Sequence, residues 1–116
     1  MCIKVIGIDL GKSSFHLVAH DESGREQYRK RFSREKALEH LANTPATLIA
    51  MESCGGSHWF ARQCQRLGHD VRLIPPQYVK PYVKTNKNDF IDADAIAEAA
   101  TRPSMRFVSV KTEEAQ

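Results

Sequence analysis

The fold is decided by the stretch Ile3-Lys4-Val5-Ile6-Gly7-Ile8-Asp9-Leu10-Gly11-Lys12. Apolar side chains occupy both of its faces, which is typical of a central strand covered on both sides. Its carboxylate, Asp9, stands where the strand ends, between Gly7 and Gly11, which leave room for a ligand or another backbone. A buried strand end is a costly place for a carboxylate unless a cation, a hydrogen bond or water meets it. Asp9 is therefore either a surface residue just beyond the strand or the first member of a site.

The composition is that of a soluble, folded protein. The chain has 116 residues, of which 41% are hydrophobic and 27% are charged, enough for one domain with a modest core. No apolar run is long enough to cross a membrane, and because Lys4 and Asp9 interrupt the first apolar stretch we expect no signal peptide. The odd set of Cys2, Cys54 and Cys64 predicts free thiols in a reducing cytoplasm, not disulfides or a zinc site.

Periodicity and turn residues predict alternating strands and helices after an initial meander. Strands are expected at the first stretch and over 14–20, 25–32, 47–52 and 70–74, and helices over 34–42, 57–67 and 89–100. Ser33 is expected to cap the first helix, Gly68 to follow the second, and Pro75-Pro76 to open a further helix or turn. The apolar faces of the first two helices would comprise Ala37, Leu38, Leu41, Ala42, Phe60, Cys64 and Leu67.

A right-handed crossover through the first helix would place the fourth strand parallel to the first. We therefore predict an α/β fold with a mixed five-stranded sheet of order 3-2-1-4-5 and helices on both faces. In that order the first and fourth strands are neighbours whose carboxyl ends meet at one edge, where α/β folds place their ligands. Glu52 ends the fourth strand as Asp9 ends the first, so the two carboxylates should meet there.

The last predicted helix adds two more acids. Asp89 and Asp92 are three residues apart and would share one helical face, whereas Asp94 should point away. Four converging carboxylates repel one another unless cations neutralise them, and all-oxygen ligands suit Mg²⁺ or Mn²⁺ better than zinc. Two such ions, about 3.5–4 Å apart, are a common arrangement for cutting or joining phosphodiesters. Taken singly, Asp89 would serve equally well as a helix cap and Asp92 as an exposed first-turn acid.

A basic segment lies between the fifth strand and the last helix. Lys80, Lys84 and Lys87 have helical spacing, with Tyr78 and Tyr82 between them. This pattern is either a solvated face or a surface that follows phosphates, with Lys80, Lys84, Lys87 and Tyr82 as candidate nucleic-acid-binding residues. The net charge of +3 suits a polyanionic partner such as DNA, more so if ions neutralise some of the 14 acidic residues.

Three motifs together resemble the DEDD motif of bacterial insertion-sequence transposases, to which the pilin-gene-inverting recombinase is similar. They are Gly-Ile-Asp-Leu-Gly-Lys around Asp9, Ala-Met-Glu-Ser-Cys-Gly-Gly around Glu52, and Lys87-Asn88-Asp89-Phe90-Ile91-Asp92-Ala93. The resemblance implies a RuvC-like domain of ribonuclease H fold that acts in DNA transposition in the cytoplasm. It also implies that Asp9, Glu52, Asp89 and Asp92 are catalytic and hold Mg²⁺, with Mn²⁺ as an alternative.

Members of this family are longer than this chain. They carry a coiled coil and a second domain with a serine nucleophile, use a structured guide RNA, and are expected to form homo-oligomers. The resemblance therefore implies that residues 1–104 are the RuvC-like DEDD catalytic domain and 105–116 the start of a truncated continuation. We expect this chain alone to be incomplete for recombination.

Three alternatives stay open. Standalone RuvC-like Holliday-junction resolvases have about this length and a similar first motif, and cut DNA by water attack. The stretch Ile6-Gly7-Ile8-Asp9-Leu10-Gly11 also resembles the first phosphate motif of actin-like ATPases, but these need two large lobes that 116 residues cannot supply. The chain could lastly be a non-catalytic nucleic-acid-binding or dimerisation fragment.

Overall fold

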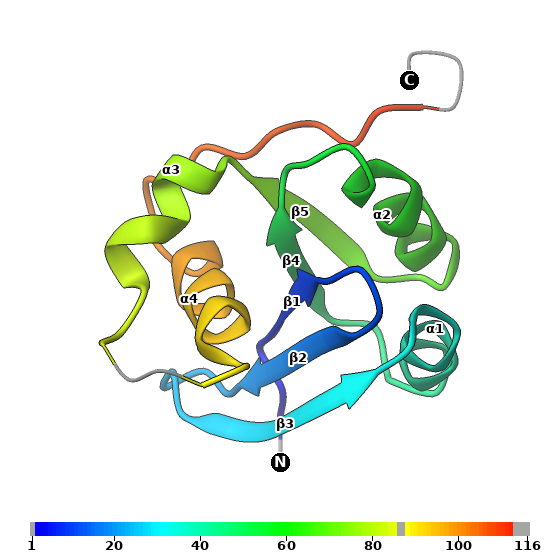
Figure 1. Ribbon diagram of the computed structural model, residues 1–116, viewed down its shortest axis with the longest axis horizontal. Coiled ribbons are helices and arrows are strands. Elements are labelled where there is room, and N and C mark those ends of the chain that lie inside the picture. The colour runs from blue at the N-terminus through cyan, green and yellow to red at the C-terminus, as the bar shows by residue number, and fades with distance from the viewer. Residues whose placement is uncertain (1, 86–87, 113–116) are drawn as a thin grey trace.

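The strands form one mixed sheet in the order β3-β2-β1-β4-β5, as the sequence predicts (Figure 1). The computed structural model describes residues 2–85 and 88–112. Its helices and strands, in chain order, are β1 (Val5–Leu10), β2 (Phe15–His20), β3 (Glu26–Phe32), α1 (Arg34–Ala42), β4 (Leu48–Glu52), α2 (Ser57–Arg66), β5 (Asp70–Ile74), α3 (Pro76–Val79), the 3₁₀ helix η1 (Lys80–Tyr82) and α4 (Ile91–Ala100).

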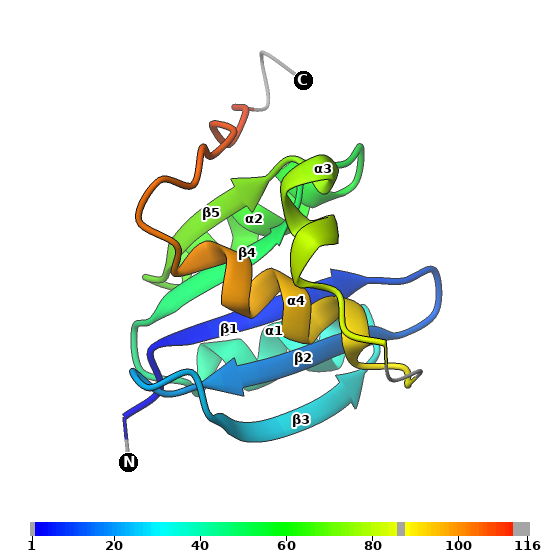
Figure 2. The same ribbon diagram turned by 90° about the vertical axis from the view of Figure 1, so that its left-hand side faces the viewer.

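Strand β1 lies at the centre of the sheet, antiparallel to β2 and parallel to β4. Strand β3 pairs with β2 antiparallel, and β5 pairs with β4 parallel. The side chains of Ile6 and Ile8 pack with α1 and α2, whereas Val5 packs with α3 and α4 on the other face (Figures 1 and 2). None of these three residues has exposed surface. The predicted doubly covered central strand is therefore confirmed.

Helices α1 and α2 bury most of their predicted apolar faces. The Ser33 hydroxyl accepts a hydrogen bond from the N–H of Lys36 at 3.2 Å, which confirms the predicted cap. Two residues at the C-terminal ends were wrongly expected to be buried. Ala42 is exposed because it follows the buried Ala37 by five residues, which places it on a different side of the helix. Leu67 is 40% exposed because α2 ends before it, and Gly68 turns the chain with φ +97°. The buried or half-buried members are Ala37, Leu38, Leu41, Phe60 and Cys64.

The chain after α4 returns to the edge of the sheet. The N–H of Val108 donates a hydrogen bond to the carbonyl of Leu73 at 2.8 Å, which makes an antiparallel bridge with β5. Further along, the N–H of Lys111 donates to Nδ1 of His58 in α2 at 3.0 Å. These contacts cover part of an edge strand that would otherwise present unpaired backbone groups.

The cysteines are free, as predicted: Cys2 and Cys54 are exposed and Cys64 is buried. Burial raises the pKa of the Cys64 thiol to about 12, so this side chain behaves as a small apolar residue at neutral pH. Within residues 2–85 and 88–112, no helix has the length and apolar character that a bilayer span requires.

Candidate active site

Asp9 and Glu52 lie beside each other at the carboxyl-terminal ends of β1 and β4. The two strands are parallel neighbours with Gly7 opposite Ala50, so two further residues bring the carboxylates level. Alternate residues of a strand point to the same face, and Ala50 packs with α4. Both carboxylates therefore stand on the α4 face of the sheet, at the edge where the sequence predicted their meeting.

Gly7 allows helix α4 to lie directly on β1 (Figure 2). A Cβ atom at Gly7 would stand 2.3 Å from the carbonyl oxygen of Ala93 and 2.6 Å from the amide nitrogen of Ala97. The space that glycine leaves is therefore filled by the backbone of a helix and not by a ligand. This close approach brings the first turn of α4, with Asp92, over the end of β1 that carries Asp9.

The three carboxylates form one electrostatic group. Burial raises the pKa of the Asp9 carboxyl, and the negative charge of Asp92 raises it further. The pKa of Glu52 is raised by burial first and then by the charges of Asp92 and Asp9. The charge of Asp92 therefore disfavours ionisation of Asp9 and Glu52, and a divalent cation would relieve that repulsion.

The chemistry of the donors fits a hard divalent cation, because carboxylate oxygens are the ligands that Mg²⁺ and Mn²⁺ prefer. In the part of the chain that the structure describes, however, no three acidic, histidine or cysteine side chains stand close enough together to enclose one ion. The arrangement is thus a set of neighbouring carboxylates at one sheet edge, coupled by charge but not closed into a cage.

Asp89 precedes helix α4, so the expectation that it shares a helical face with Asp92 is wrong. Helix α4 begins only at Ile91. Asn88 holds the preceding residues in a turn, because its Oδ1 accepts a hydrogen bond from the N–H of Phe90 at 2.8 Å. Asp89 is exposed in that turn, and since the cap position belongs to Phe90 it does not cap the helix either.

Phe90 ties this turn to the sheet. Its ring packs edge-on against the imidazole of His16, with ring centres 5.0 Å apart and an interplanar angle of 83°. The guanidinium carbon of Arg29 also lies 5.2 Å from the centre of the Phe90 ring. Strands β2 and β3 thereby fix where α4 starts, and with it the position of Asp92 over Asp9.

Two residues beside the carboxylates were not recognised from the sequence in this role. His16 pairs with Asp9 in the register of β1 and β2, and its electrostatic effect offsets part of the rise in the pKa of Asp9. Its Nε2 atom is buried without a hydrogen-bond partner among the described residues. Lys80 in η1 offsets part of the rise in the pKa of Glu52 in the same way. The tight turn over 11–14 sets the hairpin register and could have identified His16.

Asp94 points away from the group, as predicted. Its Oδ1 atom lies 2.9 Å from Nε2 of His20, whose side chain is almost fully buried at the end of β2. This contact holds the helix against β2. Acidic residues two positions apart on α4 therefore have different tasks: Asp92 belongs to the carboxylate group, and Asp94 anchors the helix.

The described part of the segment after β5 is not one continuous helix, so the helical spacing of Lys80 and Lys84 does not place them on one helical face. Helix α3 has four residues and η1 has three, and the proline at 81 removes an amide donor that a longer helix would need. The Lys84 ammonium pairs with the Glu98 carboxylate of α4. Lys87 lies outside the described residues. Of the two described lysines, Lys80 is the one whose charge acts on the carboxylate group.

Comparison with known proteins gives a consistent set of relatives. The family model of the DEDD transposases of the IS110 group, described as a transposase, matches residues 6–116. Over 114 residues the chain is 54% identical to the transposase for insertion sequence element IS1328 of Yersinia enterocolitica, covering 98% of this chain and 34% of that protein. Over 115 residues it is 48% identical to the transposase for insertion sequence element IS1111A of Coxiella burnetii, covering 98% of this chain and 31% of that protein. The chain thus spans about a third of the length of these curated relatives.

Among solved structures, the chain is similar to T. thermophilus RuvC in complex with Holliday junction substrate. The TM-score is 0.63 at 15% sequence identity, and the match covers 92% of this chain and 100% of that one. At this identity the likeness concerns the fold alone, and it confirms the predicted RuvC-like, ribonuclease H-like architecture.

Proposed function

The chain belongs to the DEDD transposases of the IS110 group, and from this membership we propose that it is their metal-binding catalytic domain for DNA strand cleavage and transfer. The observation that carries the proposal is the meeting of Asp9 and Glu52 at the ends of two parallel strands, with Asp92 close by, where burial first and repulsion second raise the pKa of Asp9 and Glu52. Such a group weakens the fold unless an opposite charge joins it. A bound divalent cation would supply that opposite charge.

We assign the catalytic and metal-binding roles to Asp9, Glu52, Asp89 and Asp92, with Mg²⁺ as the ion and Mn²⁺ as the alternative. Asp89 is included because it stands with Asp92 in the motif that resembles the family. A divalent cation bound there would stabilise the negative charge that develops on phosphodiester oxygens. The protein's own contribution is placement: two acids are held by strands of a rigid sheet, and one by the helix packed on it.

His16 and Lys80 have supporting tasks in this proposal. His16 favours the ionised form of Asp9, and Lys80 favours that of Glu52, so they counteract part of the effect of burial on these two ligands. Lys80 is exposed and can also contact a phosphate of DNA beside the carboxylates.

We further propose that residues 1–104 are the RuvC-like catalytic domain and that 105–116 begin its continuation. Because the chain spans about a third of its curated relatives, the remaining properties are proposals about a longer protein. These are recombination of DNA in the cytoplasm, assembly into a homo-oligomer and use of a structured guide RNA.

Titration calorimetry with Mg²⁺ and Mn²⁺ tests the metal site. We expect the wild-type chain to bind divalent ions and to melt at a higher temperature in their presence, because a ligand that binds only the folded state stabilises it. Asp9→Asn should weaken both effects. Glu22→Gln, which removes an exposed carboxylate from the β2–β3 turn, is the matched control and should change neither. An absence of divalent binding, or equal binding by Asp9→Asn, would contradict the assignment.

The match to the whole length of the RuvC chain favours one second candidate, a standalone enzyme that cuts DNA junctions by water attack. The two candidates share the carboxylates and differ in their products. Metal-dependent cutting without joining would favour the resolvase, whereas joined DNA ends require the transposase.

A further inference from the structure

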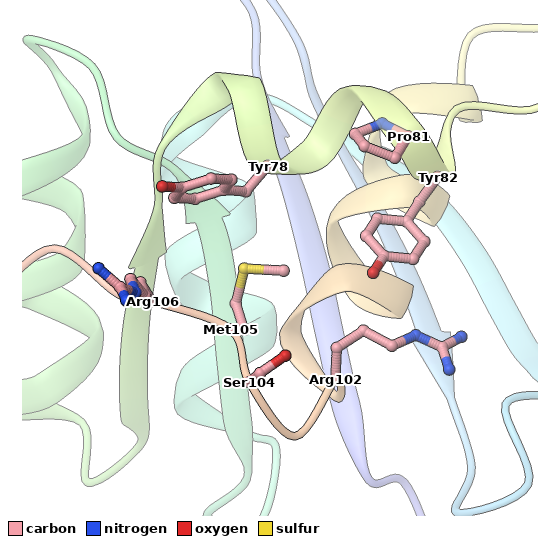
Figure 3. Close-up of a pocket in the computed structure, with 7 residues that line it drawn as sticks. All are labelled: Tyr78, Pro81, Tyr82, Arg102, Ser104, Met105 and Arg106. Carbon is pink, nitrogen blue, oxygen red and sulfur yellow. The ribbon is translucent and has the colours of Figure 1, made fainter.

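A cavity of about 280 Å³ opens between the α3–η1 segment and the chain that follows α4 (Figure 3). The rings of Tyr78 and Tyr82 project from the first segment toward the second. Pro81 lies beside Tyr82, and the remaining lining residues are Arg102, Ser104, Met105 and Arg106. The cavity therefore joins aromatic rings and arginines from two segments that are distant in the sequence.

The two tyrosines differ in availability. The Tyr82 ring is partly buried against the α4 side of the core, and the guanidinium carbon of Arg102 lies 5.4 Å from its centre. Arg102 is itself held by a 2.8 Å ion pair between its Nη2 and Oε2 of Glu98. Tyr78, by contrast, is 39% exposed, which is high for so large an aromatic ring. Tyr78 is thus the ring of this cavity that remains available to a ligand.

Arg106 gives the cavity its uncompensated charge. Its side chain is exposed, and no ion pair of Arg106 is formed within residues 2–85 and 88–112. Glu98, the acid next to the cavity, already forms ion pairs with Lys84 and Arg102. The site therefore offers one free aromatic ring beside one free cation.

We propose that this cavity binds one unpaired nucleotide of a single-stranded segment, with its base on the Tyr78 ring and its phosphate beside Arg106. Aromatic rings stack on any base, and cations that follow the backbone supply the remaining attraction. A volume of about 280 Å³ is just below the roughly 300–1,000 Å³ of sites for drug-sized ligands. It has room for one base with its sugar and none for a duplex. The inference rests on the proposed function, because it supposes that the chain acts on nucleic acid.

The position of Lys80 connects the cavity with the carboxylate group. Lys80 stands between the two tyrosines in the sequence, and its charge acts on Glu52. A strand whose phosphodiester lies at the carboxylates can thus pass Lys80 and place its next unpaired nucleotide in the cavity. In this proposal Tyr78 and Arg106 contact the nucleotide, in place of Lys84 and Tyr82, which the sequence analysis named as candidates.

Fluorescence anisotropy with labelled oligothymidine, in EDTA, tests the cavity. Tyr78→Ala should weaken binding about tenfold, since base stacking is lost, and Tyr78→Phe should retain it because the ring remains. Arg106→Ala should weaken binding and flatten its salt dependence by about 0.7 units of slope. The matched controls are Trp59→Ala, which removes a ring 40% exposed on the opposite face, and Arg31→Ala on the distant edge strand β3. Neither control should change binding.

Wild-type affinity in both Tyr78→Ala and Arg106→Ala, or an equal loss in the controls, would overturn the proposal. Tyr78 and Arg106 are exposed, so melting curves should show folded variants. Cross-linking of an oligonucleotide that contains 5-iodouracil, mapped by mass spectrometry, should mark the peptide with Tyr78, and a cross-link confined to other peptides would contradict the assignment. A parallel series with oligouridine tells whether the nucleotide comes from RNA or DNA. Because EDTA removes divalent ions, this assay and the calorimetric test of the carboxylates fail independently.

Discussion

At Gly7, the absence of a side chain decides whether the carboxylates meet. The backbone of α4 occupies the place of a Cβ atom, and this proximity brings Asp92 over Asp9 against their mutual repulsion. The helix is held there by apolar burial, because Ala93, Ile96 and other residues of its inner face have no exposed surface. Packing thus holds the carboxylates together, and their repulsion lowers the stability of the fold until an ion binds.

Gly7→Ala should disturb the packing of α4 on β1 without changing any of the carboxylates. The added methyl group would meet backbone atoms of α4 that cannot yield without moving the helix, so we expect a loss of at least about 1–3 kcal/mol of stability. For a domain of this size that lowers the melting temperature by roughly 4–8 °C per kcal/mol, and stabilisation by Mg²⁺ should be lost with it. Gly56→Ala is the control, because its φ of −82° suits alanine and no atom lies within 4 Å of the new Cβ. Equal melting of both variants would contradict the role of Gly7.

The raised pKa values of Asp9 and Glu52 predict a pH dependence with a definite sign. The folded state binds the protons of these two carboxyls more tightly than the unfolded chain does, and below the ordinary pKa values of 3.8 and 4.5 it has the full stabilisation that results. As pH rises through the raised pKa values, this stabilisation is lost. In EDTA, the stability of Asp9→Asn relative to the wild type should therefore grow between about pH 4 and pH 7. Urea denaturation at several pH values measures this difference. Saturating Mg²⁺ should abolish it, and a difference that stays constant with pH would contradict the repulsion.

At the scale of elements, local sequence patterns predict the strands and the first helix, whereas tertiary contacts determine where the last helix begins. The sequence predicted a helix over 34–42, and α1 spans Arg34–Ala42. It predicted a last helix from residue 89, but α4 starts at Ile91 because Phe90 is held by side chains from β2 and β3. These partners are about sixty to seventy-five residues away in the chain, and no local pattern reveals them. For the same reason, the sequence wrongly placed Asp89 inside the last helix.

Phe90→Ala should loosen the turn that carries Asp89 and positions Asp92. We expect divalent-ion affinity to fall roughly tenfold, as for other residues that orient metal ligands without touching the ion. Phe107→Ala is the matched control: this half-buried ring also lies under an arginine, with the Arg72 guanidinium carbon 4.9 Å from its centre, but it belongs to the segment after α4 and not to the turn before it. Calorimetry with Mn²⁺ compares the two variants. An equal loss of affinity in both would mean that general destabilisation, not the turn, weakens the site.

At the scale of the whole molecule, chain connectivity made the sheet predictable. One right-handed crossover fixes β4 parallel to β1, and the order of the other strands follows from hairpins and a second crossover. The meeting of Asp9 and Glu52 is a consequence of that order. The cavity under Tyr78 could not be predicted, because it needs the chain after α4 to return along β5, where Val108 makes a single bridge to Leu73. A single bridge in an irregular segment leaves no periodic signal in the sequence.

The division of work across a longer protein gives the last prediction. The carboxylates can hold ions and position a phosphodiester, but strand exchange also needs a nucleophile that keeps the broken end, which water cannot do and a covalent enzyme–DNA link can. The resemblance to the DEDD transposases implies a serine for this step in a second domain. We therefore expect the 116 residues alone to bind divalent ions and DNA, and not to join strands.

A chimera tests this expectation directly. The chain replaces the matching region of the IS1328 transposase, to which it is 54% identical and of which it spans 34%, so the rest of that protein supplies what this chain lacks. With Mg²⁺, plasmid DNA and any cognate RNA, the chimera should give joined products, its Asp9→Asn form should give none, and the isolated chain should give at most weak nicking. Joined products from the isolated chain would refute the division of work. Efficient metal-dependent cutting by the isolated chain, with no joining even in the chimera, would instead identify the carboxylates as those of a resolvase, because water would then be the nucleophile they serve.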